Sequence, residues 1–353
     1  MSIRINNLLL KLDNNNLDGL IVSSAANITY LTKYLSRDSY LLVSRKQNFY
    51  FTDSRYTEEA KINLEAMVSI KKANGSVFKL IAEACLELGL KRIGFEERIL
   101  PYAEYKKIQE CAGTQAEFVP THGLIEELRQ IKEPEEIKKI RQAEDITGQA
   151  LKFIEKFIKP GKKELEVAGE LERFIRQKGA SKASFEIIVA SGPNSSLPHH
   201  LTSGRKIGKG EPVLVDMGVE YEGYKSDLTR VFLPSKIDVL CQKVYGIVLE
   251  ANKRALEKAN TAKLISEIDR CGRGYIAQNG MLEFFGHNLG HGVGLEVHEE
   301  PHVSSKENTQ VKPGMVFTIE PGIYLPGKFG IRIEEMVLVS KKGAEVLSGA
   351  INK

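Results

Sequence analysis

Three of the chain's seven histidines, His287, His291 and His298, fall within residues 285–301. Imidazoles bind metals and transfer protons, so chemistry is expected first in this stretch. His287 and His291 are four residues apart, a spacing that places two zinc ligands on one face of a helix. However, no glutamate follows His287, and glycines alternate along residues 290–294, which disfavours a helix. The pattern therefore argues against a helical zinc motif.

Two aspartates lie where a hairpin would bring them together. Asp216 follows the apolar run at residues 213–215, and Asp227 comes eleven residues later, beyond a turn that contains Gly223. Paired strands would place both carboxylates side by side. Taken singly, an aspartate at the end of a strand can equally be a turn residue or a cap. The pairing of the two is what suggests a site.

Two glutamates interrupt later apolar strands. Glu320 follows residues 315–319, and Glu334 follows Ile331, Arg332 and Ile333. A buried glutamate is costly unless a partner or a cation offsets its charge. Strand alternation places Arg332 and Glu334 on the same face, so an internal ion pair between them is the simpler alternative. That pair would leave the other acids and the histidines unexplained.

Convergence of these four carboxylates with one imidazole would bury too much negative charge without cations. Two divalent ions would balance it, and ions about 3.5–4 Å apart can share a bridging hydroxide and polarise a carbonyl group. Oxygen-rich ligation with a single imidazole favours Mn²⁺, with Co²⁺ or Zn²⁺ as alternatives. Spacing alone does not establish this convergence.

The first third of the chain alternates strand and helix patterns. Strands are expected at 19–23, 40–44, 48–52, 67–71 and 92–95, and helices at 54–63, 77–88 and 101–111. This alternation predicts a small α/β domain ending at about residues 120–123. It contains no glycine-rich phosphate loop, so nucleotide binding has no support.

The remaining two thirds combine helices with a sheet. Pro134, followed by Glu135 and Glu136, marks the start of a helix because proline and acids favour the first turn. Helices are expected at 134–158 and 163–178, a helical block at 236–279, and strands at 185–190, 212–219, 224–233, 315–321 and 330–340. At 353 residues the chain exceeds one usual hydrophobic core, so two domains are expected, at 1–122 and 123–353.

The composition excludes several classes of protein. The chain is 42% hydrophobic and 27% charged, and its net charge of +4 is spread without a long basic block, which argues against nucleic-acid binding. Its four cysteines are scattered without a CxxC pair, as in proteins with reduced thiols. The N-terminal leucine run is too short for a signal peptide, and no later stretch approaches a membrane span. A cytoplasmic protein that does not contact membranes is expected.

Five motifs carry a resemblance to a known family. They are VDMG at Asp216, SDLTR at Asp227, GHGVGLEVHE at His291, TIEPGIY at Glu320 and IRIEE at Glu334. In this order they resemble the pita-bread metallopeptidases, and within these most closely the Xaa-Pro aminopeptidases and Xaa-Pro dipeptidases (prolidases). The N-terminal segments DGLIVSSAANITYLT and FTDSRYTEEA resemble the creatinase-like domain that precedes the catalytic domain in those enzymes. The resemblance thus covers the whole chain.

The resemblance implies an α/β (α+β) fold. A small creatinase-like N-terminal α/β domain, residues 1–122, would precede a pita-bread catalytic domain, residues 123–353. In the second domain, helices would pack on a curved, mostly antiparallel sheet. The family usually forms homodimers, so a homodimer is expected.

The resemblance also implies roles for individual residues. Two metals would be held by Asp216, Asp227, His291, Glu320 and Glu334, and Glu320 would also handle the proton of the attacking hydroxide. His298, His287 and His199 resemble substrate-side histidines, and His298 would hydrogen-bond substrate or the tetrahedral intermediate. Arg332 resembles the arginine that orients the site beside the last ligand. The remaining histidines match no essential position, and loop or surface roles are expected for His122, His200 and His302.

The activity so implied is metal-dependent hydrolysis of the Xaa-Pro bond, in dipeptides or at the N-terminus of longer peptides. Xaa-Pro is a tertiary amide without an N–H, so its cleavage requires an enzyme that does not bind that group. The glycines at residues 290–294 would bring the backbone close to the bound peptide. Two other classes remain, a metal-independent creatinase-type C–N hydrolase and a non-catalytic peptide-binding module. Both would be expected to have lost metal ligands, whereas all five positions are intact.

Overall fold

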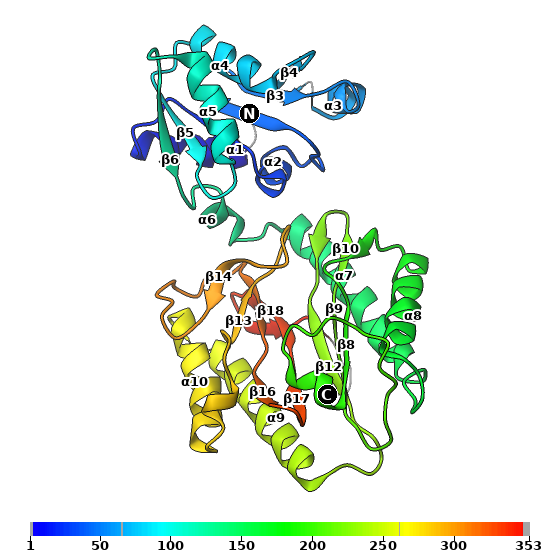
Figure 1. Ribbon diagram of the computed structural model, residues 1–353. Helices are drawn as coiled ribbons and strands as arrows, with labels where there is room; N and C mark the ends of the chain where they lie inside the picture. The colour runs from blue at the N-terminus through cyan, green and yellow to red at the C-terminus, as the bar shows by residue number, and fades with distance from the viewer. Residues whose placement is uncertain (1–2, 65, 261, 349–353) are drawn as a thin grey trace. The chain divides into compact units, whose positions relative to one another are not determined.

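The computed structural model describes residues 3–64, 66–260 and 262–348, and the chain forms two compact units, Met1–Arg129 and Gln130–Lys353 (Figure 1). Residues 123–129, which include a short helix, fall within the first unit. The division into a first domain of residues 1–122 and a second domain of residues 123–353 stays a proposal. Among the described helices, none has the length and apolar character needed to cross a membrane.

The first unit is built on one six-stranded mixed sheet with the strand order β4-β3-β2-β1-β5-β6. Its strands are β1 (Gly19–Val22), β2 (Tyr40–Ser44), β3 (Phe49–Thr52), β4 (Ser69–Lys72), β5 (Arg92–Glu96) and β6 (Glu117–Thr121). Its helices are α1 (Ile3–Asn14), α2 (Ala25–Thr32), α3 (Thr57–Leu64), α4 (Val77–Glu87), α5 (Tyr102–Ala112) and α6 (Glu126–Arg129). The predicted α/β alternation is confirmed in this unit.

Four elements of the first unit were not predicted from the sequence: α1, α2, α6 and β6. In α1 the residues Ile5, Leu8, Leu9 and Leu12 recur on one face and are buried, the pattern of an amphipathic helix. The start of α2 is capped by Ser24, whose side chain accepts a hydrogen bond from a backbone N–H in the first turn.

The second unit contains α-helices, two short 3₁₀ helices and thirteen strands among its described residues. The helices are α7 (Pro134–Ile154), α8 (Glu164–Gln177), η1 (Gly192–Ser196), α9 (Val239–Ala259), α10 (Ile265–Gln278) and η2 (Leu282–Phe284). The first strands are β7 (Lys182–Ala183), β8 (Ile188–Ser191), β9 (Val213–Met217), β10 (Val219–Tyr221), β11 (Tyr224–Lys225) and β12 (Leu228–Phe232). The later strands are β13 (Gly290–Gly292), β14 (Glu299–Val303), β15 (Val316–Ile319), β16 (Gly322–Leu325), β17 (Phe329–Arg332), β18 (Glu335–Ser340) and β19 (Gly343–Val346).

Antiparallel pairing dominates the second unit. The strand orders are β12-β9-β8, β11-β10-β7, β14-β13-β15-β18-β19 and β16-β17, and all these pairs are antiparallel. Helices α7 and α8 pack on the β8–β9–β12 group through one apolar cluster that includes Leu151 and Val215. Helices α9 and α10 pack on the later strands through a second cluster that includes Val248 and Phe317. Figure 1 shows the strands enclosed between these two helix pairs, which confirms the predicted layered fold.

Several predicted boundaries were wrong, each for a local reason. The helix predicted to residue 158 ends at Ile154, and residues 155–157 form a turn in which the Phe157 N–H donates to the Ile154 carbonyl oxygen. The strand predicted at 185–190 begins only at Ile188. The strand predicted at 330–340 is two strands, β17 and β18, in different sheets. It breaks at residues 333–334, whose backbone N–H groups are bound by Pro321 and Thr229 rather than by one ladder.

Candidate metal centre and active site

The two aspartates lie close to each other on the neighbouring strand segments of a hairpin, Asp216 within β9 and Asp227 just before β12. Strand β9 pairs with β12 so that Asp216 lies opposite Thr229, and Asp227 immediately precedes β12. Glu334 reaches the same place from the break between β17 and β18. Asp216, Asp227 and Glu334 each offer a carboxylate oxygen within 4.8 Å of the other two. The pairing of the strands therefore creates a cluster of three acids.

His291 joins this cluster from β13, between two glycines that admit no side chain. A Cβ at Gly290 would lie 2.0 Å from the Thr318 carbonyl oxygen, and one at Gly292 would lie 2.3 Å from the Glu300 carbonyl oxygen. These glycines were expected to bring the backbone close to a bound peptide. In the structure they instead allow β13 to approach the backbone of its neighbouring strands. The close approach seats the His291 imidazole beside the acids, with Nε2 3.5 Å from Asp227 Oδ2.

Glu320 completes the set just beyond the end of β15. Its Oε1 lies 3.2 Å from His291 Nε2 and accepts a hydrogen bond from Thr318 Oγ1 at 3.1 Å. His291, Glu320 and Glu334 form a second group whose ligand atoms lie within 4.8 Å of one another. The five residues proposed as ligands are therefore brought together in one place.

One amide side chain on α9 fixes both glutamate segments. Asn252 Nδ2 donates to the carbonyl oxygens of Ile319 at 2.9 Å and of Ile333 at 3.2 Å, the residues before Glu320 and Glu334. Asn252 is fully buried. Sequence reasoning missed this residue, although an asparagine on the buried face of a helix is itself a signal of a specific hydrogen bond.

The electrostatics of the cluster show mutual repulsion. Burial, followed by the charges of Glu334, Asp216 and Glu320, holds the pKa of Asp227 well above its usual value. Burial and the charges of Glu320 and Asp216 likewise raise the pKa of Glu334. Burial would raise the pKa of Glu320 too, but the hydrogen bond and charge of His291 outweigh it and lower that pKa to about 2. The raised pKa values of Asp227 and Glu334 show that the positively charged side chains nearby do not balance the negative charge of these acids.

The donor set fits divalent cations. Two buried carboxylate oxygens, Asp216 Oδ1 and Glu334 Oε1, have no hydrogen-bond partner among the described residues. Buried acceptors are normally satisfied, so unpaired oxygens aimed into one cluster are what bound cations would satisfy. Four carboxylates and one imidazole are typical ligands of oxygen-preferring divalent ions.

Arg332 bridges the cluster from β17. Its Nη2 pairs with Asp216 Oδ2 at 2.5 Å and its Nε donates to Thr229 Oγ1 at 3.0 Å. The alternative ion pair with Glu334 is wrong: in the part of the chain that the structure describes, Glu334 Oε2 instead accepts from Thr229 Oγ1 at 2.9 Å. Arg332 therefore orients Asp216 and leaves Glu334 for another positive partner.

A cavity of about 480 Å³ opens over these ligands. Its lining holds all the histidines proposed for the substrate side, His199, His287 and His298. It also holds His200 and His302, for which the sequence predicted only loop or surface roles. His122 lies in the first unit.

His298 lies close to the ligand set. Its ring centroid is 4.2 Å from that of His291, and its ligand atoms lie within 4.8 Å of those of Asp227 and His291. Burial and the neighbouring His291 lower the pKa of His298, so it is neutral at neutral pH. A neutral imidazole can donate one hydrogen bond and accept another.

His287 is tied to a tyrosine that the sequence analysis did not single out. Nδ1 of His287 lies 2.8 Å from the Asn288 carbonyl oxygen, so this nitrogen carries the proton. Nε2 then accepts from the Tyr324 hydroxyl at 2.9 Å, and the same hydroxyl accepts from Arg332 Nη1 at 2.8 Å. Both ring nitrogens of His287 are thus engaged, and the chain Arg332–Tyr324–His287 holds one wall of the cavity.

We expect Tyr324→Phe to lower kcat/KM for peptide hydrolysis about 10-fold, because it leaves a buried arginine donor and a histidine acceptor unpaired. Steady-state kinetics, with metal content measured on the same samples, would test this. Tyr221→Phe, at a partly buried tyrosine on β10, is the matched control and should have no effect. An unchanged kcat/KM in Tyr324→Phe would show that the hydroxyl does not position the site.

A buried carboxylate organises the loop that carries His199. Glu164, the first residue of α8, is fully buried and accepts hydrogen bonds from several side chains and backbone groups around this loop. Its donors are Ser191, Asn194, Ser203 and His200. His200 Nε2 lies 3.1 Å from Glu164 Oε2, so the neighbouring His199 is held at the mouth of the cavity. His200 thus helps to hold this loop, as predicted, and it also lines the cavity over the metal ligands.

Comparisons with known proteins agree with this geometry. Residues 138–341 match the model of metallopeptidase family M24, and residues 4–131 match the creatinase/prolidase N-terminal domain. An uncharacterized peptidase, YqhT, of Bacillus subtilis is 36% identical over 94% of this chain and 94% of its own. The Xaa-Pro dipeptidase of Pyrococcus horikoshii is 36% identical over 96% of this chain and 94% of its own.

Solved structures give the same result. The Xaa-Pro dipeptidase from Bacillus anthracis superposes with a TM-score of 0.94 at 38% identity, covering 99% of this chain and 98% of that one. The prolidase from Pyrococcus horikoshii gives a TM-score of 0.92 at 34% identity, covering 98% of both chains.

The layered antiparallel fold and the carboxylate-rich cavity define a peptidase of the metal-dependent class, with a creatinase-type N-terminal domain. The chain belongs to metallopeptidase family M24.

Proposed function

We propose that the protein is an exopeptidase that hydrolyses the Xaa-Pro bond, in dipeptides or at the N-terminus of longer peptides. The observation that carries this proposal is the gathering of Asp216, Asp227, His291, Glu320 and Glu334 in one cavity. Relatives that share this architecture over nearly their whole length are named Xaa-Pro dipeptidases. These relatives support the substrate class.

The same five residues would hold two divalent ions, with Mn²⁺ favoured and Co²⁺ or Zn²⁺ as alternatives. Bound there, such ions supply an activated water at neutral pH and polarise the scissile carbonyl group. The protein's own contribution is to hold the ligands. Arg332 fixes Asp216, and Asn252 fixes the backbone before both glutamates.

We assign the proton transfers to Glu320. Its Oε1 accepts a hydrogen bond from Thr318 Oγ1, which leaves Oε2 to take the proton of the attacking water and pass it to the leaving proline nitrogen. His298, neutral and exposed at the cavity, is positioned to hydrogen-bond the developing oxyanion. His199 contributes to substrate binding from the opposite loop.

The proline preference follows from the chemistry of the bond. A prolyl amide nitrogen has no hydrogen, so a site that needs no donor there loses nothing on this substrate. Phe185, Ile188 and Val297 line the same cavity and offer apolar surface to the pyrrolidine ring.

Removing the metal should abolish hydrolysis of an Xaa-Pro dipeptide, and restoring Mn²⁺ should recover it, because the ligand acids cannot activate water without cations. Activity before chelation, after chelation and after metal return, with metal analysis at each stage, provides the measurement. Full activity in a metal-free preparation would instead favour a creatinase-type mechanism. No activity after Mn²⁺ or Co²⁺ is restored would reject the proposal.

Rates on Xaa-Pro and on Xaa-Pro-Xaa peptides would separate the two possible substrate lengths. A large preference for the dipeptide would define a prolidase, and a preference for the longer peptide an aminopeptidase. We further propose a cytoplasmic homodimer, which sedimentation of the metal-loaded protein and cell fractionation would test.

A further inference from the structure

The turn between β13 and β14, residues 293–298, carries two residues that line the active-site cavity, Val297 and His298. Among the described residues, none forms a hydrogen bond with the His298 side chain, and its ring contact is with His291. His287, by contrast, is held through both of its ring nitrogens. The position of the His298 ring therefore depends on the backbone turn that carries it.

Glu299, the first residue of β14, points to the opposite side from His298. Along β14 the residues Glu299, Pro301 and Val303 are buried, whereas His302 lies on the other face and lines the cavity together with His298. Successive side chains of a strand alternate between its two faces, so the Glu299 carboxylate is directed away from the cavity and into the protein.

The carboxylate of Glu299 contacts the turn from the inside. Its Oε2 accepts a hydrogen bond from the Glu296 backbone N–H at 3.3 Å. Its Oε1 packs against the backbone of Gly294, where a Cβ would lie only 2.5 Å away. One buried side chain thus touches the turn at two points.

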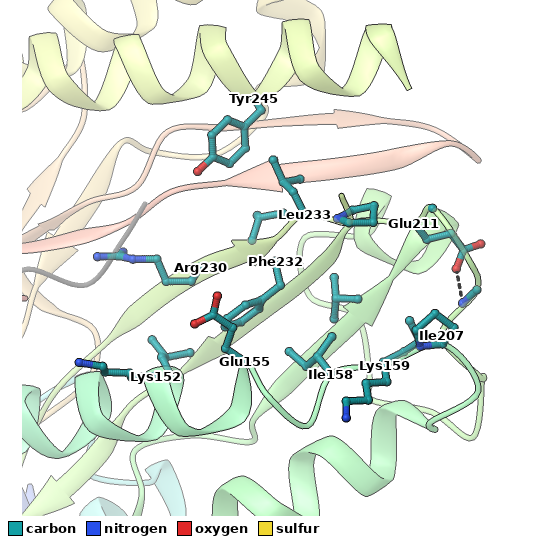
Figure 2. Close-up of a pocket in the computed structure, with 17 residues that line it drawn as sticks. Lys152, Glu155, Ile158, Lys159, Ile207, Glu211, Arg230, Phe232, Leu233 and Tyr245 are labelled. Atoms are coloured by element: carbon teal, nitrogen blue, oxygen red, sulfur yellow. Dashed lines mark hydrogen bonds between the residues drawn. The ribbon is translucent and has the colours of Figure 1, made fainter. Parts of the chain in front are cut away.

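Lys132 supplies the positive charge opposite Glu299. Two other lysines of this region, Lys152 and Lys159, lie at the surface, and Figure 2 shows their ammonium groups pointing away from a cavity between α7, β12 and α9. The side chain of Lys132, two residues before α7, is instead 1% exposed, and its Nζ lies 2.9 Å from Glu299 Oε1. The Glu299 side chain is 4% exposed, so both ends of this ion pair are shielded from water.

The backbone around Lys132 is fixed on both sides. Its N–H donates to the Gly314 carbonyl oxygen at 2.9 Å, and the Gly314 N–H donates to the Val339 carbonyl oxygen at 2.8 Å. The next residue, Glu133, donates its N–H to Glu136 Oε2 at 2.9 Å in the first turn of α7. Lys132 is therefore a fixed point to which the turn is attached.

A buried ion pair adds little net stability to a fold. The attraction between its charges is offset by the cost of removing them from water, so apolar side chains of similar volume can be equally stabilising. Charges differ from apolar groups because either one, left alone in the interior, is strongly unfavourable. The pair of Lys132 and Glu299 is thus better suited to fixing the position of the turn than to stabilising the protein.

We propose that Lys132 and Glu299 are positioning residues of the peptidase, and that their ion pair fixes the turn at residues 293–298 so that His298 faces the cavity. The two side chains do not touch the substrate and act through the backbone that carries His298. This inference rests on the proposed function, in which His298 hydrogen-bonds the developing oxyanion.

The double variant Lys132→Met, Glu299→Gln removes both charges together. It should unfold near the denaturant midpoint of the native protein, whereas Glu299→Gln alone, which leaves the Lys132 ammonium group buried without its carboxylate, should unfold at a lower denaturant concentration. In Xaa-Pro hydrolysis the double variant should lower kcat about 10-fold and change KM by less than about 2-fold, because an oxyanion contact is made only in the transition state. Arg141→Met, Glu345→Gln, which removes a half-exposed ion pair between α7 and β19, is the matched control.

His298→Ala shows whether the effect passes through His298. In this background the substitutions at Lys132 and Glu299 should lower kcat no further, because the histidine through which they act is already absent. An undiminished effect in the His298→Ala protein would overturn the proposal, and so would a double variant with the native kcat.

NMR of the His298 ring tests the positioning without an activity assay. In the zinc-loaded, diamagnetic protein, the Cε1–H signal of His298 should shift in the double variant, while that of His287, which is held by Tyr324, should not. A native protein without Xaa-Pro hydrolysis would reject the proposed function, and this signal would then decide the positioning by itself. An unchanged His298 signal in the double variant would overturn the proposal.

Discussion

Asp227→Asn is expected to lower kcat for Xaa-Pro hydrolysis more than about 1000-fold while the protein stays folded. Asp227 is 5% exposed. Its carboxylate lies within 4.8 Å of ligand atoms of Asp216 and Glu334, and its Oδ2 lies 3.5 Å from His291 Nε2. Replacing it by a neutral amide removes one negative charge from the shared site, so metal affinity falls with activity.

The same substitution should not destabilise the metal-free protein, because the Asp227 carboxylate faces three acids that repel it. Thermal unfolding with and without Mn²⁺, together with metal content per chain, separates the two effects. Mn²⁺ is expected to raise the Tm of the native protein, and this rise should be smaller in the variant. Asp145→Asn, at an exposed acid on α7, is the control. A variant with normal activity and metal content would remove Asp227 from the ligand set.

Glu144→Gln is expected to remove a large pH dependence of stability. Glu144, on α7, is buried beside Glu335, and its burial, with the charge of Glu335, raises its pKa from 4.5 to about 8, although Arg230 acts in the opposite direction. The folded protein therefore holds a proton here that the unfolded chain releases above pH 4.5. The stabilisation that this proton gives is complete below pH 4.5 and is lost as the pH rises towards 8.

Relative to Glu144→Gln, the native protein should thus lose about 1.4 kcal/mol per pH unit between pH 5 and pH 8, a few kcal/mol in total. Denaturant unfolding of the metal-free proteins at these two pH values gives the difference. The metal-site acids titrate in both proteins and cancel. Glu155→Gln, at an exposed acid just after the same helix, should show no such trend. A pH-independent difference between native and Glu144→Gln would contradict the raised pKa.

The sequence predicted those parts of the fold whose patterns are local. The prediction was right for the start of α7, where Pro134 and two acids occupy the first turn, and for the pairing of β9 with β12. Helix caps, turns and strand alternation depend on residues that are neighbours in the sequence. Helix α1 was not predicted, although Ile5, Leu8, Leu9 and Leu12 follow a helical spacing. The break between β17 and β18 was missed because Ile333 and Glu334 are bound by Pro321 and Thr229, which are distant in the sequence.

The site was predictable to the extent that acids stand out in apolar strands. Asp216, Asp227, Glu320 and Glu334 did so, and the structure brings them to one cavity. Tyr324 did not, because a tyrosine in an apolar strand is ordinary, and its function depends on where the hydroxyl points. Contacts between residues far apart in sequence, such as Arg332 with Asp216, could not be derived from spacing.

The Asn252 side chain has a consequence for how the second unit opens. Its amide binds the carbonyl oxygens of Ile319, at the end of β15, and of Ile333, in the break between β17 and β18. Both segments are bound by the same amide group, so neither can move away from α9 without breaking a hydrogen bond to Asn252. The backbone amides around Glu320 and Glu334 should therefore lose protection from hydrogen exchange together, at one common rate, although fourteen positions separate them in the sequence.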